Sequence, residues 1–73
     1  MDIPASVQKS ASHLIDRYGG GIEYLGEYDG QDAFLYEPGS EVNLGYPFVY
    51  LHKDGKVMEI NDPLSLDIIS SLS

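Results

Sequence analysis

Two Asp-Gly pairs, Asp29-Gly30 and Asp54-Gly55, constrain the fold of this chain more than any other feature of its sequence. Each pair stands between two runs rich in aliphatic and aromatic residues, the pattern of a β-hairpin closed by a two-residue type I′ turn. The spacing predicts one hairpin from strands 22–28 and 31–37, and a second from strands 48–52 and 57–60. Two such hairpins favour a single antiparallel sheet of four strands.

Two-residue turns also determine which residues face each other across each hairpin. A shift of one residue would exchange the two faces of a strand, so these pairings decide which side chains share a face. We expect Gly26 opposite Ala33, Leu25 opposite Phe34 and Tyr24 opposite Leu35 in the first hairpin, and Leu51 opposite Met58 and Val49 opposite Ile60 in the second.

Amphipathic helices are predicted at both ends of the chain. The first, 4–18, begins at Pro4, whose missing N–H has no helical partner in a first turn, and ends at the glycines 19–21. The second has Asp62 as a good N-cap and Pro63 as a good first residue. The apolar stripes are Val7, Ala11, Leu14, Ile15 and Tyr18 in the first helix and Leu64, Ile68, Ile69 and Leu72 in the second.

These elements predict one small α+β domain, 1–73, in the order α-β-β-β-β-α. We expect both helices to pack on one face of the antiparallel sheet, because each stripe needs apolar surface to cover. Between the hairpins, residues 38–46 are rich in turn formers and read as a linker. The face predicted to lie under the helices carries Ile22, Tyr24, Ala33, Leu35, Val49, Leu51, Met58 and Ile60.

The opposite sheet face is predicted to be apolar and aromatic at its centre, with acidic residues around it. An exposed apolar patch with a polar border usually marks an interaction surface. Because a chain of 73 residues can bury only a small core, we expect a non-enzymatic interaction module that forms a homodimer through this face. The predicted interaction residues are Leu25, Phe34, Tyr36, Phe48, Tyr50 and Val57, with a rim of Glu23, Glu27, Asp32, His52 and Glu59.

Charge adds a second hypothesis. Twelve acidic residues against four basic ones give a net charge of −8, which argues against nucleic acid because few groups could neutralise phosphates. The same charge suits an acidic inhibitor, or an immunity or antitoxin-type protein, that binds a basic protein. A third alternative is a small-ligand-binding domain or enzyme that uses the aromatic face and the linker as a pocket.

The sequence predicts no catalytic, cofactor-binding or metal-binding residues. His13 lies near Asp16, Ser10 and Ser12, but helical spacing places it on a solvated face away from the apolar stripe. His52 is accompanied only by carboxylates, a weak ligand set for zinc, and the glycines 19–21 follow a helix instead of preceding one, the wrong polarity for a phosphate loop. The absence of cysteine, of a signal pattern and of a long apolar segment favours a cytoplasmic location without membrane contact.

Overall fold

The computed structural model describes residues 3–39, 41 and 45–72 and contains the predicted elements in the predicted order. The predicted linker, 38–46, includes residues 40 and 42–44, which lie outside the described residues. The elements are helix α1 (Ala5–Tyr18), strands β1 (Gly21–Tyr28), β2 (Gln31–Glu37), β3 (Val49–Lys53) and β4 (Lys56–Ile60), and helix α2 (Pro63–Ser71). The four strands form one antiparallel sheet in the order β1-β2-β3-β4.

Both Asp-Gly pairs form the predicted turns. Asp29 and Gly30 have φ angles of 51° and 77°, and Asp54 and Gly55 have 51° and 76°. Positive φ at both central residues is the signature of a type I′ turn, whose twist matches that of the flanking strands. The predicted register of the second hairpin is confirmed, since Leu51 pairs with Met58 and Val49 with Ile60.

The first hairpin keeps its predicted register only as far as Gly26, which pairs with Ala33. Beyond it Tyr24 pairs with Phe34, so the predicted pairings of Leu25 with Phe34 and of Tyr24 with Leu35 are wrong. Leu25 is the extra residue of a β-bulge, and Gly26 beside it has φ 132°, a value that residues with a Cβ rarely adopt.

This bulge moves the first half of β1 to the opposite sheet face from the one predicted. Ile22 and Tyr24 pack with the aromatic residues, whereas Leu25 packs with the cluster on the other side. Glu23, which pairs with Leu35, goes to that other side as well.

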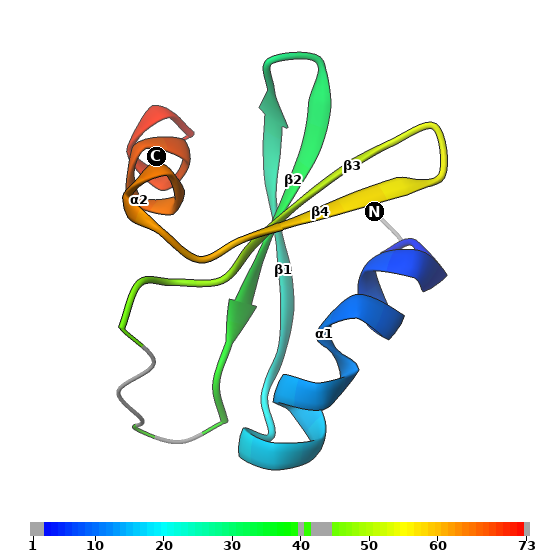
Figure 1. Ribbon diagram of the computed structural model, residues 1–73, viewed down its shortest axis with the longest axis vertical. Coiled ribbons are helices and arrows are strands. Elements are labelled where there is room, and N and C mark those ends of the chain that lie inside the picture. Colours follow the sequence, from blue (N-terminus) through cyan, green and yellow to red (C-terminus); the bar gives the residue numbers. More distant parts are fainter. Residues whose placement is uncertain (1–2, 40, 42–44, 73) are drawn as a thin grey trace.

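The two helices lie on opposite faces of the sheet, so the prediction that both cover one face is wrong (Figure 1). Both sheet faces are apolar at their centre, and one helix can shield only one of them from water. Leaving the other exposed would forfeit about 25 cal/mol for each Å² of apolar surface. Under α1 the buried cluster is Val7, Ala11, Leu14, Phe34, Tyr36 and Tyr50, and under α2 it is Ala33, Val49, Leu51, Ile60 and Ile68.

Helix α2 begins as predicted, with Pro63 as its first residue. The Asp62 side chain caps it by accepting a hydrogen bond of 2.9 Å from the backbone N–H of Leu64. The predicted stripe differs at its start, because Leu64 is exposed and Ser65 takes the buried position. The Ser65 hydroxyl donates to the Asp62 carbonyl at 2.8 Å, which satisfies this polar group inside the core. Neither described helix has the length and the apolar character that a membrane span requires.

Candidate functional site

The residues predicted to form an exposed aromatic face are the core beneath α1. Phe34 and Tyr50 are fully buried and Tyr36 is 3% exposed, while Phe48 and Val57 are half-buried and pack against them. Leu25 lies on the opposite face because of the bulge in β1. The structure therefore brings five of the six predicted contact residues together, but covers them with the helix of the same chain.

Tyrosine hydroxyls tie this core to its surroundings. The Tyr36 hydroxyl donates towards the carbonyls of Leu14, at 3.1 Å, and Gly19, so it caps the last turn of α1. Burial is the main reason why the pKa of Tyr36 is raised. The side chain of Tyr36 therefore fixes the end of α1 against the sheet.

Two carboxylates of the predicted rim also bind tyrosines of this core. The Tyr50 hydroxyl donates to Oε2 of Glu59 at 2.7 Å, and the Tyr24 hydroxyl donates to Oδ1 of Asp32 at 3.3 Å. Burial, followed by the hydrogen bond with Glu59, raises the pKa of Tyr50 well above its usual range. Burial and the charge of Asp32 raise the pKa of Tyr24. Glu59 and Asp32 thus satisfy partly buried hydroxyl groups of their own chain.

The remaining rim residues separate. His52 pairs with both Asp32 and Val57 across the sheet, and Glu27 also pairs with Asp32, so these three stay on the α1 side. Glu23 instead shares the α2 side with Glu37, and a hydrogen bond between these two carboxyl groups, followed by their charge repulsion, raises the pKa of Glu37.

His13 lies beside Glu59, with 3.9 Å between Nε2 and Oε2. Both side chains are largely open to solvent, at 60% and 40% exposed, so this contact is a weak surface ion pair that requires a protonated histidine. Among the described residues, no group of three or more His, Asp or Glu side chains could hold a metal ion.

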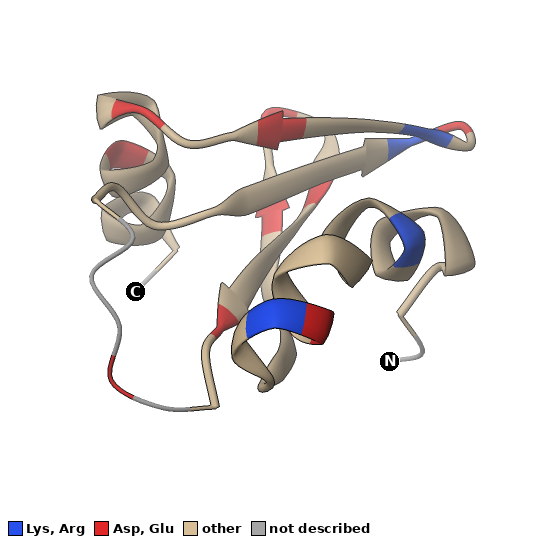
Figure 2. Cartoon of the chain, turned by 60° about the horizontal axis from the view of Figure 1, so that its bottom comes forward, with Lys and Arg blue, Asp and Glu red and all other residues tan. Residues whose placement is uncertain are grey.

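Charge is strongly segregated over the molecule. All four basic residues lie in α1 (Lys9 and Arg17) or beside the β3–β4 turn (Lys53 and Lys56). Residues 18–52 contain six acidic residues and no Lys or Arg, and residues 57–73 contain three and none. Figure 2 shows the consequence: the charged positions of α2 are all acidic, while every basic position lies on α1 or at the hairpin tip, each of which also carries an acidic one. Lys53 and Lys56 share the α2 side of the sheet with Leu51 and Met58, but they lie at its end beside the β3–β4 turn, so only the region around α2 itself is uniformly negative.

Exposed apolar side chains occur within this negative region. Tyr46 is 44% exposed, Leu64 42% and Leu66 47%. Tyr46 is close to α2, because its carbonyl accepts a hydrogen bond from the Asn61 side chain and it lines a hollow of about 300 Å³ together with Ile69. Leu64 and Leu66 are two residues apart on a helix, so they flank α2 on different sides of the buried Ser65. We call the exposed outer part of α2 with its two flanks the α2 surface: Tyr46, Asp62, Leu64, Leu66 and Asp67. Sequence reasoning missed it, although Leu66 gave a signal as an apolar residue outside the predicted helical stripe.

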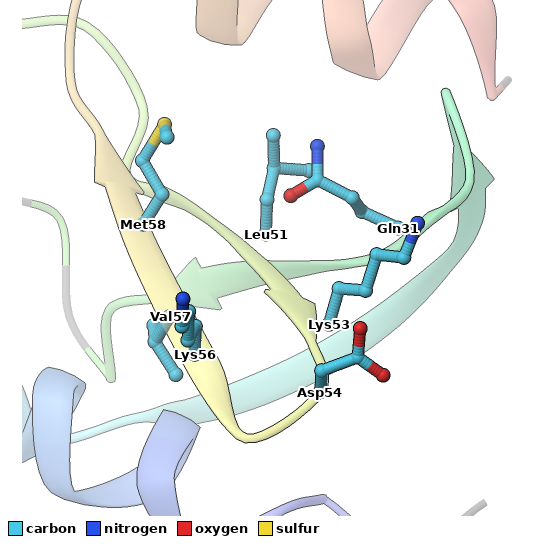
Figure 3. Close-up of a pocket in the computed structure, with 7 residues that line it drawn as sticks. All are labelled: Gln31, Leu51, Lys53, Asp54, Lys56, Val57 and Met58. Carbon is cyan, nitrogen blue, oxygen red and sulfur yellow. The ribbon is translucent and has the colours of Figure 1, made fainter.

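A second candidate site is a hollow of about 410 Å³ beside the β3–β4 turn. Leu51 and Met58, which face each other across the two strands, form its apolar part. Figure 3 shows Lys53 and Gln31 on one side of these residues and Lys56 on the other. The hollow therefore combines apolar surface with two of the four cationic groups of the chain.

Comparisons of the chain with protein-family models, with curated proteins and with solved structures found no match.

Proposed function

We propose that this protein is a small acidic interaction module that binds a basic protein through the α2 surface. One observation carries the proposal: exposed apolar residues, Tyr46, Leu64 and Leu66, lie in a region whose charged residues are all acidic. Such a surface offers apolar anchors that can be desolvated on binding, together with a negative field that attracts a partner of opposite charge.

The two kinds of residue are expected to control different steps of binding. Carboxylates at the border of an interface mainly accelerate the encounter, so Asp62 and Asp67 should set the association rate. Apolar side chains hold the complex once it has formed, so Leu64 and Leu66 should set the dissociation rate. The exposure of all four side chains means that each can be replaced without opening the core.

Self-association through the aromatic face has less support, because that contact would require α1 to leave the core residues that it covers. Charge also opposes pairing of two copies, since each chain carries a net charge of −8. A homodimer built on another surface stays a prediction that a measurement of solution mass would test.

The test begins with capture of partners on the immobilised chain from an extract of the organism that encodes it, at low and at high salt. The purified partner is then bound to four forms of the chain: the natural one, Asp62→Asn/Asp67→Asn, Leu64→Ser/Leu66→Ser and a control with the same charge change, Asp16→Asn/Asp54→Asn. We expect a basic partner whose association rate falls about tenfold in the first double variant and in high salt. The leucine variant should mainly dissociate faster.

The charge-matched control decides whether the α2 surface is involved, because Asp16 and Asp54 lie among the basic residues instead. Equal effects of the two charge variants would show that net charge alone attracts the partner. Retention of no basic protein, or a partner whose affinity does not depend on salt, would contradict the proposal.

A further inference from the structure

The hollow beside the β3–β4 turn lies on the α2 side of the sheet, next to the part that α2 covers (Figure 3). Met58 is 57% exposed there, the most exposed large apolar side chain among the described residues, whereas its neighbour Leu51 is 4% exposed. The apolar surface of the hollow is thus continuous with the α2-side core at Leu51 and opens to solvent at Met58. An apolar ligand group could extend the core at this point and would shield Met58 from water.

The two lysines of the hollow are uncompensated by their own chain. Lys53 and Lys56 pair directly across the strands, so two like charges share one face, an arrangement that destabilises a sheet. The described part of the chain contains a single ion pair, between His13 and Glu59, and neither lysine has a carboxylate oxygen within 4.0 Å of its ammonium group. Asp54 reaches the rim from the turn without forming such a pair.

We propose that this hollow binds a small amphipathic carboxylate, a single negative group on an apolar body. The carboxylate would be held at Lys53, with the Gln31 side chain as a further donor, while Lys56 adds positive charge from the other side of the hollow and the apolar body covers Leu51 and Met58. A volume of about 410 Å³ lies within the size range of small-molecule sites. A single negative charge suits this chain better than a polyphosphate, because Asp54 and the net charge of −8 disfavour additional charge. This inference is independent of the α2 surface.

Octanoate is a suitable probe, with 1-octanol as the uncharged ligand of the same chain length. In a titration followed by ¹H–¹⁵N correlation spectra, we expect octanoate to shift the amide signals of Leu51, Lys53, Lys56 and Met58 in a saturable way. Octanol should bind at least tenfold more weakly, because it keeps the apolar contact and loses the charge.

Four variants locate the site. Lys53→Gln/Lys56→Gln should weaken octanoate binding at least tenfold, whereas Lys9→Gln/Arg17→Gln, which removes the other two cations, should leave it unchanged. Asp54→Asn should tighten binding by removing the competing carboxylate. Met58→Glu should abolish binding, because it adds a negative charge within the hollow, and its spectrum should stay dispersed since Met58 is exposed.

Three results would overturn the proposal. The first is equal binding of octanol and octanoate. The second is an equal loss of octanoate binding in Lys53→Gln/Lys56→Gln and in the control Lys9→Gln/Arg17→Gln. The third is the absence of saturable shifts in the natural chain at millimolar octanoate. A shift pattern centred on α2 or α1 would likewise assign the ligand to another surface.

Discussion

At the residue scale, the core under α1 is built on tyrosines whose rings pack inside it and whose hydroxyls donate hydrogen bonds to polar partners. Tyr50 is the clearest example, because the residue is fully buried and its hydroxyl donates a hydrogen bond of 2.7 Å to Glu59. Such residues combine a large apolar contact with a satisfied polar group, so they suit a core close to the surface. In the sequence alone the same residues suggest an interface, because interfaces are also enriched in tyrosine, which offers a large apolar ring together with a polar hydroxyl.

Tyr50→Phe tests this assignment through pH. The pKa of Tyr50 is raised in the folded chain, so ionisation of the unfolded chain above about pH 10 pulls the equilibrium towards unfolding. The stability that Tyr50 contributes is therefore complete below about pH 10 and is lost as the pH rises further.

We expect the variant to lose about 1 kcal/mol of unfolding free energy at neutral pH, because the hydrogen bond to Glu59 is gone. Above about pH 10 its stability should fall less steeply with pH than that of the natural chain. Urea unfolding at a series of pH values measures both effects. Identical slopes in the alkaline range would mean that Tyr50 ionises as freely in the folded chain as in the unfolded one.

Gly20 gives a second test at this scale, with Gly21 as its control. Gly20 has φ 89°, and a Cβ at this position would overlap the carbonyl oxygen of Glu37, where the end of α1 meets the end of β2. At Gly21 a Cβ would meet no described atom within 4 Å.

Gly20→Ala is therefore expected to lower the unfolding free energy by about 2 kcal/mol or more. Gly21→Ala should change it by no more than about 0.5 kcal/mol. Thermal and urea unfolding of both variants provide the comparison. A similar stability of the two would contradict the close approach between residues 19–20 and 38–39.

At the element scale, the sequence predicted each helix and strand but not the side of the sheet to which each helix belongs. An amphipathic stripe states only that a helix needs apolar surface, and here both sheet faces supply it. The β1 bulge had a local signal, because an isolated glycine within a strand pattern, Gly26, often marks one. The position of α1 had none, since it depends on the path of the chain after residue 18 and on the packing of the whole molecule.

A glutamate introduced at a buried and at an exposed position of the sheet tests whether α1 covers the aromatic face. Phe34→Glu would bury a carboxylate under α1, where Phe34 is fully buried, and should cost more than about 4 kcal/mol, enough to unfold a domain of this size. Met58→Glu places the same group on an exposed position and should change stability by less than about 1 kcal/mol.

Circular dichroism and thermal melting of both variants give the result. If Phe34→Glu kept its melting temperature and changed only the mass in solution, Phe34 would belong to an interface between molecules and not to the core.

At the scale of the whole molecule, two helices on two faces supply two small cores from one chain. The short chain suggested that a second copy is needed to complete the hydrophobic core, but these two cores make that argument for a homodimer weaker. The acidity of the α2 surface could be predicted from the positions of the charged residues in the sequence, since residues 57–73 contain three acidic residues and no Lys or Arg. The apolar groups within it could not, because the exposure of Tyr46, Leu64 and Leu66 depends on how α2 packs. The lysine-lined hollow could not be predicted either, because it exists only where α2 no longer covers the sheet.

Nuclear Overhauser effects can show whether α1 covers the aromatic face of its own chain. A mixture of ¹³C-labelled and unlabelled chains separates contacts within a molecule from contacts between molecules. We expect strong effects within one chain between the methyl groups of Val7, Ala11 and Leu14 and the rings of Phe34 and Tyr50, and none between labelled and unlabelled chains. Ring contacts that appear only between chains, or rings without contacts to α1, would show that α1 does not cover this face of its own chain.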